Sequence, residues 1–177
     1  MTISFLIRVR DHARVGMSED VPASSGRINM WKTTVAEWMT TPVITAVDGS
    51  SLADIQRIME SHRIHQVPIV RNGMLVGLVT QRAIHKTQPV EARLTPVEWR
   101  SLMAKIPVVS LLHGPPLETP PDADLHDAAQ LMITNGVTSI TVTMQHRPVG
   151  MITISDLFRP LLIGMRGAHH ENHTCSS

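Results

Sequence analysis

The second half of this 177-residue chain repeats the first half at a constant offset of 73 residues. The corresponding positions carry the same or similar side chains: Leu52 and Leu125, Met59 and Met132, Ile69 and Val142, Gly77 and Gly150, and Thr80 and Thr153. A register that continues this far without a gap indicates that one structural unit is duplicated within the chain. We therefore expect two similar halves, related by an approximate two-fold axis, that cover each other's apolar faces.

The hydrophobic pattern predicts the same order of elements in each half: helix, strand, helix, strand, strand, helix. Val35, Trp38 and Met39 lie at helical spacing, and Pro42 ends this short helix. The elements expected after it are an extended segment at 42–47, a helix at 51–61, strands at 67–70 and 74–80 joined by an Arg-Asn-Gly turn, and a helix at 80–86. The corresponding helices of the second half are expected at 124–135 and 155–163.

These elements predict an α+β fold class with two pseudo-symmetric repeats. One repeat alone would have a marginal core, whereas two small mixed sheets packed face to face, with the helices outside, would be stable and would leave clefts at their junction. The predicted organisation is a poorly ordered N-terminal extension at 1–29, a first repeat at 30–86, a linker at 87–105, a second repeat at 106–164 and a flexible C-terminal tail at 165–177.

Composition excludes several classes of function. Hydrophobic residues make up 42% and charged residues 18% of the chain, and the net charge of +1 comes from dispersed charges, which argues against a nucleic-acid surface. There is no Tyr and there are only two Phe residues, so a base-stacking platform is not expected. No apolar run approaches the roughly 20 residues of a membrane span. The single Cys175 cannot form an internal disulfide, which favours a reducing compartment and a cytoplasmic location.

The segment 150–156 is the strongest candidate for a binding site in the sequence. Its apolar first half predicts a strand, and Thr153 or Ser155 is placed to cap the helix that follows. Hydroxyl groups and backbone N–H groups at a strand-to-helix junction suit an anion such as a phosphate, and the carboxylate of Asp156 could accept hydrogen bonds from a sugar diol. The alternative is that Ser155 and Asp156 only cap the helix.

Several motifs, in order and twice, resemble a tandem pair of CBS domains, often called a Bateman module. In the first copy they are Glu37-Trp38-Met39-Thr40, Ser51-Leu52-x-Asp54, Ile64-His65-Gln66-Val67-Pro68-Ile69-Val70 and Gly77-Leu78-Val79-Thr80. In the second copy they are Asp124-Leu125-x-Asp127-Ala128 and the segment 150–156. The resemblance covers about residues 33–163. It implies a non-enzymatic regulatory module that homodimerises through its helices and binds AMP, ADP, ATP or S-adenosylmethionine between the repeats.

The resemblance also implies roles for individual residues. Asp156 would hold the ribose hydroxyls, and Thr153 and Ser155 would face a phosphate. The adenine would be held by backbone groups of the partner repeat. His65 is open to two interpretations, a phosphate-facing side chain or an ordinary partly buried histidine. The resulting candidate ligand-binding residues are Thr33, Ile64, His65, Thr138, Thr153, Ser155 and Asp156.

The first repeat departs from the family pattern, because Ala83 stands where the second repeat has Asp156. A ribose bound there would lose its main acceptor, so one of the two pseudo-symmetric sites is expected to be weak or empty. Arg82 beside it either meets a phosphate or faces solvent. The alternative to a nucleotide-binding module is therefore a ligand-free structural dimer whose sites have decayed.

The tail holds several potential metal ligands between His169 and Cys175. Nothing in the sequence sets their geometry, so a disordered tail that binds metal adventitiously is the preferred interpretation, with a metal site as the remote alternative. The sequence contains no nucleophile elbow, P-loop or dinucleotide-binding motif. We expect no catalytic residues, no metal site and no required cofactor, and an effector protein as the target of regulation.

Overall fold

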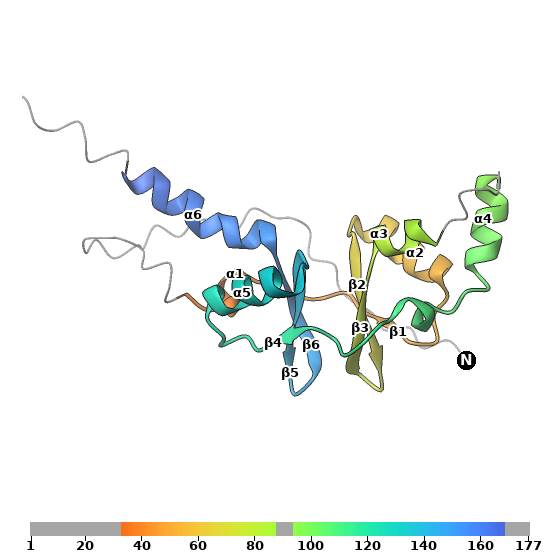
Figure 1. Ribbon diagram of the computed structural model, residues 1–177, viewed down its shortest axis with the longest axis horizontal. Coiled ribbons are helices and arrows are strands. Elements are labelled where there is room, and N and C mark those ends of the chain that lie inside the picture. Colours follow the sequence, from red (N-terminus) through yellow and green to blue (C-terminus); the bar gives the residue numbers. More distant parts are fainter. Residues whose placement is uncertain (1–32, 88–93, 169–177) are drawn as a thin grey trace, which may run out of the picture.

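The computed structural model describes residues 33–87 and 94–168, and its elements follow the order expected from the sequence (Figure 1). The first repeat contains α1 (Val35–Trp38), β1 (Ala46–Val47), α2 (Leu52–His62), β2 (Gln66–Arg71), β3 (Met74–Thr80) and α3 (Gln81–Lys86). The rest of the described chain contains α4 (Pro96–Met103), a 3-10 helix (Val108–Leu111), β4 (Glu118–Thr119), α5 (Leu125–Asn135), β5 (Ser139–Met144), β6 (Arg147–Thr153) and α6 (Ile154–Ala168).

Each repeat has one three-stranded mixed sheet, as predicted. The sheet orders are β1-β2-β3 and β4-β5-β6, and in both the first pair of strands is parallel and the second antiparallel. The hairpin between β2 and β3 turns through Asn72 (φ 53°) and Gly73 (φ 79°), the left-handed pair that a tight hairpin favours. The second hairpin uses Gln145 and His146 in the same conformation without a glycine. The α+β fold class is confirmed.

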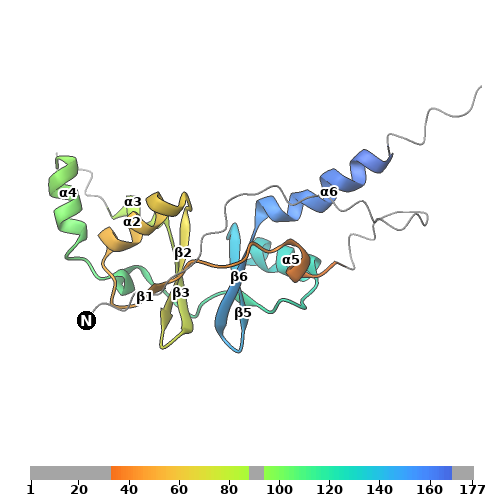
Figure 2. The same ribbon diagram turned by 180° about the vertical axis from the view of Figure 1, so that it is seen from behind.

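The two repeats exchange their leading segments. The Val35 N–H donates to the carbonyl of Ala123 in the second repeat, and the Val108 N–H donates to the carbonyl of Ser50 in the first, each at 2.9 Å. These two bonds are equivalent under the 73-residue offset. Figures 1 and 2 show the consequence: α1 lies beside α5, at the end of the molecule away from β1.

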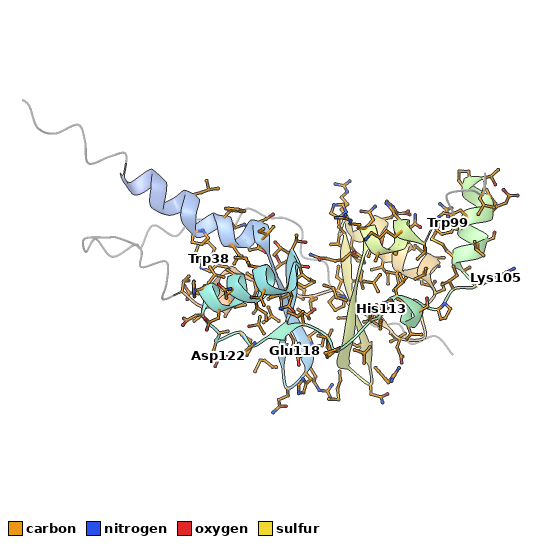
Figure 3. The ribbon with its side chains drawn as sticks, viewed as in Figure 1. Trp38, Trp99, Lys105, His113, Glu118 and Asp122 are labelled. Atoms are coloured by element: carbon orange, nitrogen blue, oxygen red, sulfur yellow. The ribbon has the colours of Figure 1, made fainter. Side chains whose placement is uncertain are left out.

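The exchange completes the hydrophobic core of each repeat with residues from outside it. Val35, with Trp38 packed beside it, belongs to the core of the second repeat, while Met103 and Val108 belong to the core of the first. Trp38 and Trp99, the aromatic residues of the two leading segments, accordingly lie toward opposite ends of the molecule (Figure 3). Part of the expected linker 87–105 is therefore a packed helix, because α4 packs on α2 and buries Met103.

The sheets of the two repeats meet along the pseudo-two-fold axis. Ser139 Oγ donates a hydrogen bond to Gln66 Oε1, and these residues are 73 positions apart, so the axis passes between them. Each leading segment also crosses the opposite hairpin at a glycine. A Cβ added to Gly77 would lie 2.6 Å from Leu112 Cδ2, and one added to Gly150 would lie 2.7 Å from Met39 Sδ. This close approach explains why the duplication keeps a glycine at both positions.

Helix α6 is longer than the sequence pattern predicted. It runs to Ala168, past the expected end at 163 and into the segment expected to be a tail from 165. Gly164 and Gly167 weaken a helix by about 1 kcal/mol each but leave its hydrogen bonds in place, and α6 also continues through Pro160. Residues 169–177, which include the His-rich segment, lie outside the described residues, as does the expected extension 1–29.

One buried hydroxyl is left without a partner, which gives a test of the packing. Thr141 is fully buried on β5, and its Oγ1 has no hydrogen-bond partner within the described part of the chain. Replacing it by the isosteric valine removes this unsatisfied group, so we expect Thr141→Val to raise the free energy of unfolding by about 1 kcal/mol, measured by urea denaturation.

Thr143 on the same strand is the matched control. It is also buried, but its Oγ1 donates to Glu118 Oε2 at 2.9 Å. Thr143→Val should lower the free energy of unfolding by about 1 kcal/mol, because it breaks a hydrogen bond. Equal effects of the two substitutions would contradict the difference in hydrogen bonding.

Candidate functional site

The junction of β6 and α6 gathers the polar side chains that the sequence singled out. Thr153 is the last residue of β6, and both its backbone N–H (2.9 Å) and its Oγ1 (2.7 Å) donate to Asp156 Oδ2. The N–H of Ile154, the first residue of α6, donates to the carbonyl of Thr138 at 2.9 Å. Thr153, one of the two residues that the sequence offered as a cap, thus occupies the capping position, and Ser155 does not.

The carboxylate of Asp156 is buried, with its side chain only 4% exposed. Oδ2 already accepts two hydrogen bonds, whereas Oδ1 lies 3.5 Å from Arg159 Nη1. Oδ1 is therefore the oxygen left to accept a bond from a ligand hydroxyl. The Arg159 side chain is 62% exposed and can swing into solvent, which would uncover Oδ1.

The equivalent junction in the first repeat has the same backbone geometry without the carboxylate. The Gln81 N–H donates to the carbonyl of His65 at 2.7 Å, as Ile154 does to Thr138. Thr80 Oγ1 accepts a bond from the Ala83 N–H at 3.1 Å, so the hydroxyl caps α3 directly. The chemical difference between the two junctions is confined to side chains.

A cleft of about 420 Å³ lies between the repeats on the side of Ala83. It is lined by Thr80 and Arg82 of the first repeat, by the connecting segment 111–117, and by 136–139 of the second repeat. The guanidinium of Arg82 and the hydroxyls of Thr80 and Thr138 give this cleft donors for an anion, but no carboxylate for a ribose.

The structure brings only part of the predicted set together. Thr153, Ser155 and Asp156 share the β6–α6 junction, with the Thr138 backbone beside them, and Ser155 is exposed. Ile64 and His65 line a hollow between α2 and α3, where His65 Nδ1 shares a hydrogen bond with Gln81 Oε1 at 2.7 Å.

Thr33 has a structural role at the start of α1. Its Oγ1 donates to Glu37 Oε2 (3.0 Å) and accepts from Trp38 Nε1 (2.7 Å), and its carbonyl accepts from the Leu125 N–H. Among the described residues, none of its hydrogen bonds reaches the β6–α6 junction. The segment that lies against β6 contains Thr40, which exchanges backbone hydrogen bonds with Met151 at 2.8 and 3.1 Å. Thr40 belongs to a motif that carries the family resemblance, but the sequence predicted no site role for it.

The sequence contained a signal that some segment crosses β6 closely at Gly150. Gly150 precedes Met151, and its lack of a side chain lets Met39 and Thr40 cross β6 closely. A glycine inside an apolar strand indicates such an approach. The chain contained no comparable signal for which segment would make it.

The carboxylates with clearly shifted pKa values in the described part of the chain are those of helix caps. Hydrogen bonds from the Ser51 hydroxyl and backbone N–H lower the pKa of Asp54 below its usual value, although burial opposes this. The backbone N–H of Thr34, followed by the hydroxyls of Thr34 and Thr33, lowers the pKa of Glu37 in the same way. Asp54 therefore has the capping role of Asp156 at a helix end remote from the β6–α6 junction.

The CBS domain family matches this chain twice, at residues 35–88 and 102–163. The chain belongs to this family and contains a tandem CBS pair. The CBS domain-containing protein YhcV of Bacillus subtilis is 26% identical over 123 residues, which are 70% of this chain and 81% of YhcV. An uncharacterized 33.4 kDa protein from Thermofilum pendens is 31% identical over 130 residues, but the chain spans only 43% of its length.

Solved CBS pairs have the same fold. The CBS domain pair of protein MJ0100, in complex with 5-methylthioadenosine and S-adenosyl-L-methionine, is 24% identical with a TM-score of 0.60, and the match covers 76% of this chain and 98% of that one. The CBS domain of a bacterial CNNM/CorC family Mg2+ transporter, in complex with ATP, is 20% identical with a TM-score of 0.61, over 75% of this chain and 89% of that one. At these identities the likeness concerns the fold.

The carboxylate at the β6–α6 junction can be tested without any ligand. Asp156→Ala removes the acceptor of two hydrogen bonds at the start of α6, so we expect the free energy of unfolding to fall by about 1 kcal/mol. The reciprocal substitution, Ala83→Asp, places a carboxylate at the equivalent position of α3 and should raise stability by a few tenths of a kcal/mol. Chemical denaturation measures both, and an unchanged stability of Asp156→Ala would contradict the cap.

Proposed function

We propose that this protein is a non-enzymatic regulatory module that binds an adenosine derivative at the β6–α6 junction. The observation that carries the proposal is the buried Asp156 carboxylate, which has one oxygen free of cap hydrogen bonds. In the proposed complex Asp156 Oδ1 accepts the ribose hydroxyls, while the hydroxyls of Thr153 and Ser155 face the phosphate. Structurally similar CBS pairs that hold S-adenosyl-L-methionine and ATP support this class of ligand.

The charge around the junction favours a ligand of modest charge. Arg159 is the cation that the structure places beside Asp156, and the residues equivalent to His65 and Gln66 are the neutral Thr138 and Ser139. AMP and S-adenosylmethionine therefore fit better than ADP or ATP, whose additional phosphates would need more cations. The cleft beside Arg82 lacks the carboxylate and is the weaker of the two proposed sites.

The proposed output is a change in how the module binds an effector protein. If the two repeats can adopt two relative arrangements, a ligand that binds one arrangement more tightly increases its population. An effector protein that recognises that arrangement then binds more of the module. The proposed assembly is a homodimer in the cytoplasm. Among the described residues, no helix is long and apolar enough to cross a membrane.

The second candidate is a ligand-free structural dimer. The observation in its favour is that Asp156 already has a complete local role, because it caps α6 from a buried position. The absence of a carboxylate at Ala83 points the same way. In this candidate the junction stabilises the fold and holds no ligand.

Thermal shift in the presence of AMP, ADP, ATP or S-adenosylmethionine separates the two candidates. A ligand at 100 times its Kd should stabilise the protein by about 2.7 kcal/mol, which raises the Tm. Asp156→Ala should abolish most of this shift, relative to its own Tm without ligand. If none of the four compounds raises the Tm of the unmodified protein, the proposed nucleotide-binding function is wrong.

Asp54→Ala is the matched control for this experiment. It removes a capping carboxylate of the same kind, bonded to Ser51, from the start of α2. It should lower the Tm without ligand as Asp156→Ala does, but keep the full ligand-induced shift. Equal losses of the shift in both variants would mean that the ligand responds to general stability and that Asp156 does not hold the ribose.

A further inference from the structure

Arg159 stands beside the carboxylate proposed to hold the ribose. It lies on α6 three residues after Asp156, and its Nη1 is 3.5 Å from Asp156 Oδ1, the oxygen that takes no part in the helix cap. Charge-assisted hydrogen bonds from a guanidinium to a carboxylate are usually about 2.7–2.9 Å long. The buried carboxylate therefore has one oxygen that a cation covers without bonding to it firmly.

The start of α2 shows the same kind of pair in its complete form. Arg57 follows Asp54 by three residues, and its Nη2 lies 2.7 Å from Asp54 Oδ1. The Asp54 side chain is 44% exposed, whereas that of Asp156 is 4% exposed. Burial makes an oxygen without a firm partner costly, so the Asp156 carboxylate gains more from a ligand hydroxyl than the Asp54 carboxylate would.

Helix stability does not account for a cation at this position. Arg159 lies in the second turn of the 15-residue α6, away from the C-terminal end where the helix dipole favours positive charge. Its side chain is 62% exposed, and pairs with an exposed partner contribute little because solvent screens them. In the first repeat the equivalent residue, Lys86, lies in the last turn of α3, where the dipole does favour it.

Arg159 is also a neighbour of the hydroxyl proposed to face the phosphate. Ser155 precedes it by four residues, and residues three and four apart lie next to each other on a helix surface. Both side chains are exposed, and side chains of a helix point back toward its N-terminus. One guanidinium therefore adjoins both the proposed ribose acceptor, Asp156, and the proposed phosphate-facing residue, Ser155.

We propose that Arg159 selects ligands that carry a 5′-phosphate, so that the site takes a nucleoside monophosphate such as AMP. This inference rests on the proposed function and names the ligand within it. Without a ligand the guanidinium covers Asp156 Oδ1. When the ribose hydroxyls take that oxygen, the guanidinium moves to the phosphate, whose oxygens match its planar arrangement of N–H donors.

The same movement disfavours nucleosides without the phosphate. Adenosine displaces Arg159 from Asp156 and offers the guanidinium no anion in return. S-adenosylmethionine carries a sulfonium cation at the 5′ position, where AMP has its phosphate, and like charges repel. Both compounds therefore bind more weakly than AMP, although the ribose and the base are the same.

Titration calorimetry of the full chain with AMP and with adenosine tests the selection, because these compounds differ only in the phosphate. The unmodified protein should bind AMP about tenfold more tightly, the effect of one charge-assisted hydrogen bond. Arg159→Gln should remove this preference by weakening AMP about tenfold, with a change of about twofold or less for adenosine. Arg159→Lys keeps the charge and should retain part of the preference.

Arg57→Gln is the matched control. It removes the cation from the pair with Asp54, which has the same spacing on α2 and lies away from the β6–α6 junction. It should change the affinity for neither compound. Circular dichroism checks that the Arg57→Gln and Arg159→Gln variants are both folded.

The outcomes keep this inference separate from the proposed function. Three results would overturn selection by Arg159 and leave the nucleoside site in place: equal affinities of the unmodified protein for AMP and adenosine, tighter binding of S-adenosylmethionine than of AMP, or an equal loss of AMP and adenosine affinity in Arg159→Gln. If no adenosine compound binds the unmodified protein, the proposed function is wrong, and this inference with it.

Discussion

The structure depends on the exchange of leading segments between the two repeats. Two equivalent backbone hydrogen bonds, from Val35 to Ala123 and from Val108 to Ser50, fasten each segment to the repeat that it does not belong to in the sequence. Each core is incomplete without the exchanged residues, and one repeat alone is too small for a stable core. The two repeats are therefore one folding unit, and both of them line the cleft beside Arg82.

The duplication gives the same backbone twice, so differences in side chains can be compared within one molecule. At the strand-to-helix junctions the backbone bonds are equivalent, from Gln81 to His65 and from Ile154 to Thr138, but only the second junction has a carboxylate. On the outer helices, Glu60 and His85 of the first repeat correspond to the exposed Ile133 and Phe158 of the second. Ligand binding is proposed for the second repeat, which has the carboxylate.

The contacts that hold the two repeats together and the side chains that differ between the repeats involve different atoms, so the two do not conflict. The contact along the axis relies on glycines, backbone groups and the Gln66–Ser139 hydrogen bond, all close to where the repeats meet. The asymmetric residues lie at the junctions and on the outer helices, where a change of side chain does not disturb that contact. A duplicated fold can thus specialise one half and keep the other as support.

The sequence by itself determined the duplication, the order of elements, both hairpins and a helix cap at Thr153 or Ser155. These features depend on periodicity, turn residues and local hydrogen bonds, which neighbouring residues specify. The tertiary structure decided the exchange of leading segments, the contact of Thr40 rather than Thr33 with β6, and the exposed apolar face of α5 and α6. A glycine such as Gly150 indicates that a segment crosses the strand closely, but no residue type indicates which segment does so. An apolar stripe on a helix has the same sequence pattern whether it faces the core or a second molecule.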